Sequence, residues 1–358
     1  MINFTVGPVQ MCEEVCRIGE EQVPYFRTQE FSKIMKENEN LMKKFTGAGE
    51  KARVLFLTGS GTASMEAAIM NTLTQEDKAL VINGGSFGQR FVDLCQIYEV
   101  PYTEIKLYYG QKLRKEMLEK YTGDKYTCLI VNVHETSTGV HYDLNMLHEF
   151  CQENHLFFIV DAISSFLADP IDMEKQGIDV LITGSQKALA VPPGISILTL
   201  SKKAINRIEN NHVKSLYFNL KLALKNGERG QTPFTPAVSI LRQIHQRLLM
   251  IDENGGANSE ISRVHELAID FRNRIKNLPV DIFSEEVSNA VTALKTRNVS
   301  AKKIFDILKD EYQIWICPNG GELSEKVFRV GHIGNLTITD NTVLIEALDD
   351  LVKRKILI

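Results

Sequence analysis

Short apolar runs alternate with helix-like segments between about residues 50 and 200. The runs are rich in Val, Ile, Leu and Phe and are continuous rather than alternating, which is typical of strands covered on both faces. Strands separated by helices predict an α/β protein with a large, doubly wound domain built on a mostly parallel sheet. The expected strands are 52–58, 78–83, 127–133, 156–161, 180–183 and 194–200, and the expected helices are 60–73, 87–98 and 145–154.

The last ~110 residues have a different pattern, which predicts a smaller α+β domain. Short strands are expected at 280–283, 290–296, 314–317 and 327–330, with helices at 262–277, 300–312 and 340–355. The glycine-containing segment 252–256 is the expected joint. We therefore divide the chain into a large domain of residues 15–252 and a small domain of residues 253–358, which the N-terminal segment 1–14 joins.

Composition narrows the class of protein. The 358 residues can bury a large core, and the net charge of −4 offers no electrostatic footprint for nucleic acid or an anionic membrane. The N-terminus lacks a basic stretch followed by an apolar one, and no apolar run approaches the ~20 residues of a membrane span. We expect a cytoplasmic protein without nucleic-acid or membrane partners.

The cysteines and histidines do not form a metal-binding pattern. Cys12 and Cys16 are four residues apart, which would place two thiolates on one helix face, but no second pair follows at zinc spacing. The other cysteines are scattered, and His134 and His141 are isolated. We expect reduced, structural cysteines and no metal site.

Two residues carry the strongest chemical signal. Asp161 and Lys187 each lie just beyond an apolar run, and the carboxyl ends of parallel strands face one crevice. An aspartate that keeps a pyridinium nitrogen protonated and a lysine that forms an imine are the groups that pyridoxal phosphate requires. A lysine among apolar neighbours also has a depressed pKa. The alternatives are a helix-capping aspartate and an ordinary surface lysine.

The segment Thr58-Gly59-Ser60-Gly61-Thr62 joins a strand to a helix. Ser60 can cap that helix, and free N–H groups at a helix start favour a phosphate. A tight turn without a ligand and a dinucleotide-binding fingerprint are the alternatives. Ser64 replaces the third glycine of that fingerprint, and the next strand ends on Asn83 rather than on an acid, which disfavours a nicotinamide-dependent dehydrogenase.

Three further positions carry weaker signals. Phe87 presents a flat ring that suits a planar cofactor, although a core anchor at a helix start is as plausible. The hydroxyls of the loop after His134, Thr136 among them, suit a phenolic oxygen or a substrate, whereas the alternative is a plain polar loop. Arg329 has the planar fork that binds carboxylates, or it is a salt-bridge partner.

Together these motifs resemble the class V aminotransferases of the fold type I pyridoxal phosphate enzymes. The branch contains alanine–glyoxylate, serine–pyruvate and 2-aminoethylphosphonate–pyruvate aminotransferases. The resemblance covers nearly the whole chain and rests on Gly7-Pro8, Gly59-Ser60-Gly61-Thr62, the segment 83–90, Glu135-Thr136-Ser137-Thr138-Gly139-Val140, Val160-Asp161-Ala162, Gly184-Ser185-Gln186-Lys187-Ala188-Leu189, Pro233-Phe234-Thr235-Pro236 and Phe328-Arg329-Val330-Gly331.

The resemblance implies pyridoxal 5'-phosphate as cofactor and a role for each matching residue. Lys187 would form the Schiff base with the cofactor and move the substrate proton, and Asp161 would pair with the ring nitrogen. Arg329 would bind the substrate carboxylate. The remaining contacts implied are Phe87 and Ile163 on the two ring faces, Thr136 near the phenolic oxygen, Ser60, Gly61, Thr62 and Gln186 at the phosphate, and Thr235 at the phosphate of a neighbouring subunit. Thr235 therefore implies a homodimer with shared active sites.

Three other functions remain open. A class V lyase of the cysteine desulfurase type shares the fold, but Phe87 and Gln186 stand where such enzymes carry histidines, and Pro318 follows the only late cysteine, Cys317. A non-catalytic cofactor-binding protein and a dehydrogenase are the others. For a transaminase, we expect alanine, serine or 2-aminoethylphosphonate as donor and pyruvate or glyoxylate as acceptor.

Overall fold

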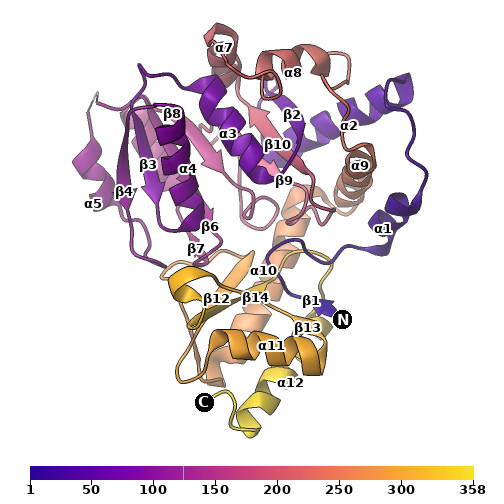
Figure 1. Ribbon diagram of the computed structural model, residues 1–358, viewed down its shortest axis with the longest axis vertical. Helices are drawn as coiled ribbons and strands as arrows, with labels where there is room; N and C mark the ends of the chain where they lie inside the picture. Colours follow the sequence, from indigo (N-terminus) through magenta and orange to yellow (C-terminus); the bar gives the residue numbers. More distant parts are fainter. Residues whose placement is uncertain (124) are drawn as a thin grey trace.

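A seven-stranded sheet forms the centre of the large domain in the computed structural model, which describes residues 1–123 and 125–358 (Figure 1). Along the sheet the strands are β2 (Arg53–Thr58), β10 (Ile195–Leu200), β9 (Val180–Gly184), β8 (Phe157–Asp161), β5 (Cys128–Asn132), β3 (Ala79–Asn83) and β4 (Tyr102–Lys106). The pairs from β9 to β4 are parallel, whereas β10 is antiparallel to both of its neighbours. The predicted fold class is confirmed.

Successive residues of the central strands enter different cores. Phe157 and Ile159 of β8 pack in one hydrophobic cluster, and Phe158 and Val160 pack in another. Both faces of the sheet are therefore buried, which explains the continuous apolar runs. The edge strand β4 was not predicted, because its residues are mixed in character and mostly half-buried.

The helices of the large domain follow the strands of the sheet. α3 and α4 begin directly after the carboxyl ends of β2 and β3, so their N-termini lie at the same edge of the sheet as Asp161. The helices are α1 (Glu13–Glu20), α2 (Gln29–Thr46), α3 (Gly61–Thr72), α4 (Ser86–Ile97), α5 (Lys115–Leu118), α6 (Leu144–Glu153), α7 (Lys202–Asn210), α8 (Leu220–Gly227) and α9 (Val238–Glu253). A small hairpin of β6 (His134–Glu135) and β7 (Val140–His141) follows β5.

The small domain is an antiparallel sheet with helices (Figure 1). Its strands, in spatial order, are β11 (Val280–Ile282), β12 (Val291–Thr296), β15 (Val327–Gly331) and β14 (Cys317–Pro318), and its helices are α10 (Gly256–Arg274), α11 (Ala301–Tyr312) and α12 (Ile338–Lys353). The strand expected at 314–317 is divided, because β13 (Ile314–Trp315) pairs with the N-terminal β1 (Ile2–Asn3) instead. We propose the boundary between the domains where α9 ends and α10 begins.

No helix among the residues that the structure describes combines the length and the apolar character needed to cross a membrane.

Candidate active site

Asp161 and Asn132 are the last residues of neighbouring strands, β8 and β5, and lie opposite each other in the sheet register. The Asn132 side-chain amide donates to Asp161 Oδ2 at 2.9 Å, and the backbone N–H of Ile163 donates to Oδ1 at 2.9 Å. Burial raises the pKa of Asp161 to about 6, although both hydrogen bonds act in the opposite direction. Within the described residues Asp161 has no salt bridge, so it is an acid without a cationic partner.

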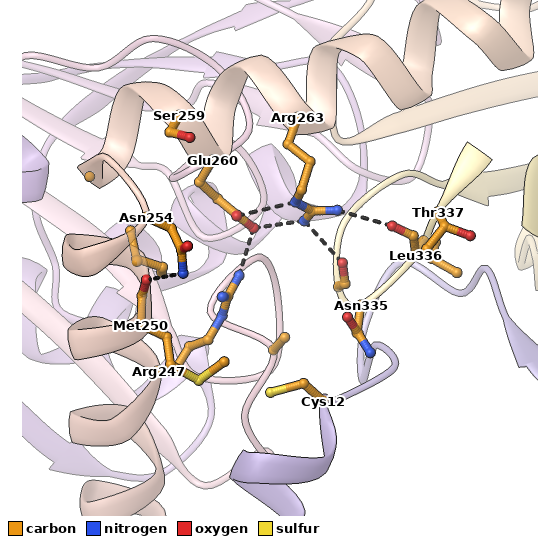
Figure 2. A pocket seen from close by; sticks show the side chains of 14 residues that line it. Cys12, Arg247, Met250, Asn254, Ser259, Glu260, Arg263, Asn335, Leu336 and Thr337 are labelled. Atoms are coloured by element: carbon orange, nitrogen blue, oxygen red, sulfur yellow. Dashed lines mark hydrogen bonds and ion pairs between the residues drawn. The ribbon is translucent and has the colours of Figure 1, made fainter. Parts of the chain in front are cut away.

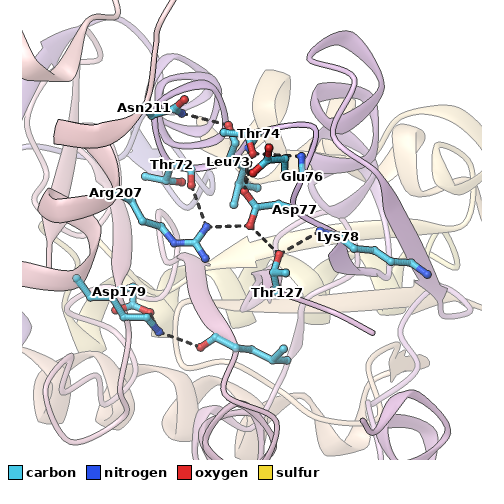
Figure 3. Close-up of polar contacts among 12 residues, drawn as sticks. Thr72, Leu73, Thr74, Glu76, Asp77, Lys78, Thr127, Asp179, Arg207 and Asn211 are labelled. Carbon is cyan, nitrogen blue, oxygen red and sulfur yellow. Dashed lines mark hydrogen bonds and ion pairs between the residues drawn. The ribbon is translucent and has the colours of Figure 1, made fainter. Parts of the chain in front are cut away.

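The acids at the opposite edge of the same sheet are different (Figure 3). Asp77 accepts from Arg207 at 3.0 Å and from Thr127 at 2.7 Å. Asp179 pairs with Lys203 at 3.1 Å. Each of these carboxylates has a basic partner and holds the amino ends of strands together. Of these three acids, only Asp161 lacks a basic partner among the described residues, and it lies at the carboxyl edge, where ligands of open α/β sheets bind.

Lys187 lies in the loop between β9 and β10 and is 8% exposed. Its Nζ donates to the carbonyl of Val6 in the N-terminal segment. Gly7 packs against the lysine side chain, since a Cβ at Gly7 would lie 2.8 Å from Lys187 Cδ. Burial, together with the charge of Arg329, lowers the pKa of Lys187 to about 8. A larger fraction of this amine is neutral near pH 7 than of an exposed lysine, as a nucleophile requires.

The loop that carries Lys187 is held at both of its ends. The Ser185 hydroxyl donates to the carbonyl of Pro192 at 2.7 Å, and the Ser185 N–H donates to the carbonyl of Ile195 at 3.0 Å. Gln186 lies next to the lysine, and its buried Oε1 has no hydrogen-bond partner in residues 1–123 or 125–358. An orphaned acceptor of this kind points to a missing ligand or water.

The glycine turn before α3 leaves some of its polar groups free, although the Gly59 N–H donates to the carbonyl of Gly194 at 2.8 Å. Ser60 is the N-cap residue, but its side chain makes no capping hydrogen bond, contrary to expectation, and it is exposed. Thr62 accepts from Arg90 at 2.8 Å. Ile163 packs directly on Gly61, where a Cβ would overlap the isoleucine side chain. The turn thus presents uncommitted N–H groups beside Ile163, two residues after Asp161.

Phe87 and Thr136 lie on neighbouring segments near this edge. Phe87 is half-buried at the start of α4, with the Arg90 guanidinium 4.8 Å from its ring centroid. Thr136 is buried, and its hydroxyl lies 2.6 Å from the hydroxyl of Ser164.

Arg329 extends from β15 of the small domain towards the large domain. It donates to the carbonyl of Thr136 at 3.0 Å, to the carbonyl of Pro318 at 2.7 Å and to Cys317 Sγ at 3.1 Å. Its Nε is buried and has no partner, and none of the ion pairs within the described chain involves it. This uncompensated guanidinium is close enough to Lys187 to lower the lysine pKa.

Thr235 is the one predicted site residue that stands apart. It is exposed, on the loop before α9, and lines a hollow of about 600 Å³ with residues 23–26. A hydrogen bond from the Ala237 N–H to the Thr58 hydroxyl, at 3.2 Å, links this loop to the glycine turn.

A second hollow, of about 430 Å³, lies at the junction of α9, α10 and residues 334–337 (Figure 2). Glu260 occupies one side and accepts from Arg247 and Arg263, each at 2.7 Å. Arg263 also donates to the carbonyls of Gly334 and Leu336. None of the predicted site residues lines this hollow, and its charged groups join the two domains.

Asn132, Val6 and Gly7 contact the two central residues but were not predicted as site residues. Asn132 is indistinguishable in sequence from any polar residue that ends a strand, because its pairing with Asp161 depends on the order of strands in the sheet. Val6 and Gly7 are far from Lys187 in sequence, and only the return of the N-terminal segment brings them there.

This fold, with a buried amine and an uncompensated acid at one sheet edge, defines a pyridoxal phosphate enzyme. The chain belongs to the aminotransferase class-V family, whose sequence profile matches residues 23–329. It is an aminotransferase.

The relatives agree with this assignment. An uncharacterized aminotransferase of Methanocaldococcus jannaschii is 31% identical over 338 residues, which cover 92% of this chain and 86% of that protein. The alanine–glyoxylate aminotransferase of Felis catus is 30% identical over 362 residues, which cover 97% of this chain and 86% of that protein. The crystal structure of an alanine–glyoxylate aminotransferase from Nostoc sp. has a TM-score of 0.91 and 26% identity, and covers 98% of this chain and 95% of that chain.

The cofactor of the chain is pyridoxal 5'-phosphate, as in its family. The residues present fit it: an amine with a lowered pKa, an acid without a counterion and a helix start behind a glycine turn. The cysteine desulfurase alternative is not favoured, because relatives named for an amino-acid reaction are aspartate–, alanine– and serine–glyoxylate aminotransferases.

Proposed function

We propose that this chain transfers an amino group from a small donor, such as alanine, serine or 2-aminoethylphosphonate, to pyruvate or glyoxylate. The observation that carries the proposal is the uncompensated guanidinium of Arg329 near the Lys187 amine. A planar cation without an acidic partner suits the carboxylate that these acceptors share. The names of the relatives, alanine–glyoxylate and serine–glyoxylate aminotransferase, support the choice of small substrates.

Lys187 and Asp161 divide the chemistry between them. When bound, the cofactor supplies an electron sink for the pair of electrons left when the substrate loses its Cα proton. Asp161, buried at the end of β8, keeps the ring nitrogen protonated. Lys187 would hold the cofactor through its amine, and once a substrate is bound its Nζ would accept the proton from the substrate Cα.

The lowered pKa of Lys187 supports both of its tasks. Near its pKa of about 8, an amine accepts and releases protons with little bias in either direction near neutral pH. Burial also fixes the stem of the side chain between Gly7 and its own loop. The amine is therefore held in a defined position, which would favour proton transfer to and from a bound substrate.

Other residues bind and orient. We assign the ring faces to Phe87 and Ile163, the phenolic oxygen to Thr136, and the phosphate to Ser60, Gly61, Thr62 and Gln186. The free N–H groups at the start of α3 support the phosphate assignment, since a helix N-terminus favours an anion. The close packing of Ile163 on Gly61 supports a continuous surface between phosphate and ring.

We also propose a homodimer in which Thr235 reaches the phosphate of the partner's cofactor. Two observations support this role. Thr235 is exposed, and it lines an apolar hollow with Val23, Pro24, Tyr25 and Phe26. Large exposed apolar side chains mark interaction sites. The molecular mass in solution tests the dimer, and a mass near 40.4 kDa would contradict it.

A donor and acceptor screen tests the function. The enzyme loaded with pyridoxal phosphate is mixed with single amino acids, and the absorbance of the bound cofactor reports conversion to the pyridoxamine form. We expect rapid conversion by at least one of alanine, serine and 2-aminoethylphosphonate, and the reverse change on adding pyruvate or glyoxylate. Conversion by large aromatic donors alone would contradict the small-substrate proposal, and release of sulfide from cysteine without transamination would indicate a lyase.

A further inference from the structure

Glu135 is a fully buried carboxylate that none of the roles above uses. Its Oε2 accepts from the backbone N–H groups of Phe87 and Gly88, each at 3.0 Å. Its Oε1 accepts from the backbone N–H of Ser137 at 3.2 Å and from the Ser137 hydroxyl. One side chain therefore joins the first turn of α4 to the loop that carries Thr136.

Glu135 takes the place of a missing helix cap. Gly85 is the N-cap residue of α4 and supplies no side-chain hydrogen bond. It also leaves the space that the carboxylate fills, since a Cβ at Gly85 would lie 2.6 Å from Glu135 Cδ. The positive end of the helix dipole favours a negative group in this position.

All four contacts use the carboxylate oxygens as acceptors. Burial raises the pKa of Glu135, although the hydrogen bonds from Ser137, Gly88 and Phe87 oppose this rise. Every neighbour that contacts the carboxylate is a donor, so an amide in the same place would turn an N–H₂ group against another N–H. Glutamine is thus a close match in shape that loses about half of the contacts.

We propose that Glu135 is a positioning residue that fixes the Phe87 ring and the Thr136 loop around the cofactor. This inference rests on the proposed function, in which Phe87 contacts the ring. The effect extends further, because the carbonyl of Thr136 accepts from Arg329 at 3.0 Å and the Thr136 hydroxyl lies 2.6 Å from Ser164. A carboxylate outside the substrate site thereby sets three contacts within it.

The test is a comparison of cofactor affinity with stability. Pyridoxal phosphate is titrated into the cofactor-free forms of the wild type, Glu135→Gln, Phe87→Ala and the double variant, and the thermal unfolding midpoint of each is measured. We expect Glu135→Gln to weaken cofactor binding by about tenfold, the lower end of what loss of an orienting partner costs at metal sites. In the Phe87→Ala background the same change is expected to weaken binding clearly less than in the wild type, because only the Thr136 loop then remains for Glu135 to position.

Asp179→Asn is the matched control. Asp179 is also a buried carboxylate, and it accepts from the Phe158 N–H at 3.0 Å and the Ser201 hydroxyl at 2.9 Å, but at the opposite edge of the sheet. It is expected to lower the unfolding midpoint and to leave cofactor affinity unchanged. If Glu135→Gln does not fold, Glu135→Asp keeps the charge, shortens the reach and is expected to weaken cofactor binding in the same Phe87-dependent way.

Wild-type affinity in Glu135→Gln, an equal loss in the Phe87→Ala background, or an equal loss in Asp179→Asn would each overturn the inference. A wild-type chain that binds no pyridoxal phosphate would overturn the proposed function and the inference together. The two failures are therefore distinguishable.

Discussion

The amide of Asn132 is bonded to the carboxylate of Asp161 across two adjacent parallel strands, Nδ2 to Oδ2 at 2.9 Å. This bond favours the ionised acid, so Asn132→Ala raises the pKa of Asp161 further above about 6. Less of the acid is then charged at neutral pH. We expect kcat/KM at pH 7 to fall about tenfold, because one hydrogen bond to a charged group contributes about 1.5–3 kcal/mol. We also expect the acid limb of the kcat/KM profile to move to higher pH.

The control for this variant is Asn38→Ala, which removes another buried amide, bonded to the carbonyl of Leu241. It is expected to reduce stability without moving the acid limb. An unchanged pH profile in Asn132→Ala would show that the amide does not tune Asp161.

Removing the amine of Lys187 is expected to stabilise the cofactor-free protein while abolishing turnover. The pKa of this buried lysine is lowered from 10.5 to about 8, so below pH 8 the folded state carries a buried charge that the unfolded state exposes to water. Between the two pKa values the unfolded state binds more protons, and stability rises with pH. Lys187→Met removes the penalty, which is at most about 3 kcal/mol at pH 7.

Denaturant unfolding of the cofactor-free protein at pH 7, 9 and 11 measures this effect. The advantage of Lys187→Met is expected to shrink as the pH rises from about 8 and to disappear above 10.5, where the wild-type lysine is neutral in both states. The exposed Lys51→Met is the control and is expected to change little at any pH. An advantage that does not depend on pH would show that packing, not charge, is its cause.

Arg329→Ala is expected to raise the KM for 2-oxo acids by about tenfold to a hundredfold, since one charge-assisted hydrogen bond contributes about 1.5–3 kcal/mol. Steady-state kinetics with pyruvate and glyoxylate measure the change. Arg297→Ala is the control, because that arginine pairs with Asp281 on the surface and is half exposed. Unchanged kinetics in Arg329→Ala would remove the residue from the carboxylate site.

Gly7→Ala is expected to displace Lys187. The residue has φ of +126°, which L side chains rarely adopt, and the added Cβ would lie 2.8 Å from Lys187 Cδ. We expect a loss of about 1–3 kcal/mol in the free energy of unfolding and a slower reaction of Lys187 with pyridoxal phosphate. Gly256→Ala has a positive φ but open space around it, so it is expected to cost stability alone. Equal reactivity of Lys187 in both variants would exclude the packing role of Gly7.

The sequence predicted six of the seven strands of the large sheet and the fold class, because strands buried on two faces have few polar residues. The strand missed, β4, lies at the sheet edge and lacks that signal. The convergence of Lys187 and Asp161 was predicted from their places beyond strand ends, whereas the place of Arg329 followed from the resemblance. Local pattern fixes where a strand ends, but not which strand lies beside it.

For the same reason the supporting residues were not predicted. Asn132 and Glu135 act through side-chain contacts between segments, and Val6 acts through a carbonyl, which no side chain in the sequence reveals. Ser60 was expected to cap α3, but its side chain makes no such bond, because capping depends on a rotamer and not only on position.

The reversed direction of β10 limits how Lys187 can move. A strand parallel to β9 would need a long crossover connection after it, whereas the antiparallel β10 begins beside the end of β9. The lysine therefore lies on a hairpin connection that is anchored in the sheet at both ends. Any movement of the Lys187 amine must then come from rotation about the bonds of its four-carbon side chain. Burial and the packing of Gly7 against the stem restrict these rotations, so the N-terminal segment controls how far the amine can swing.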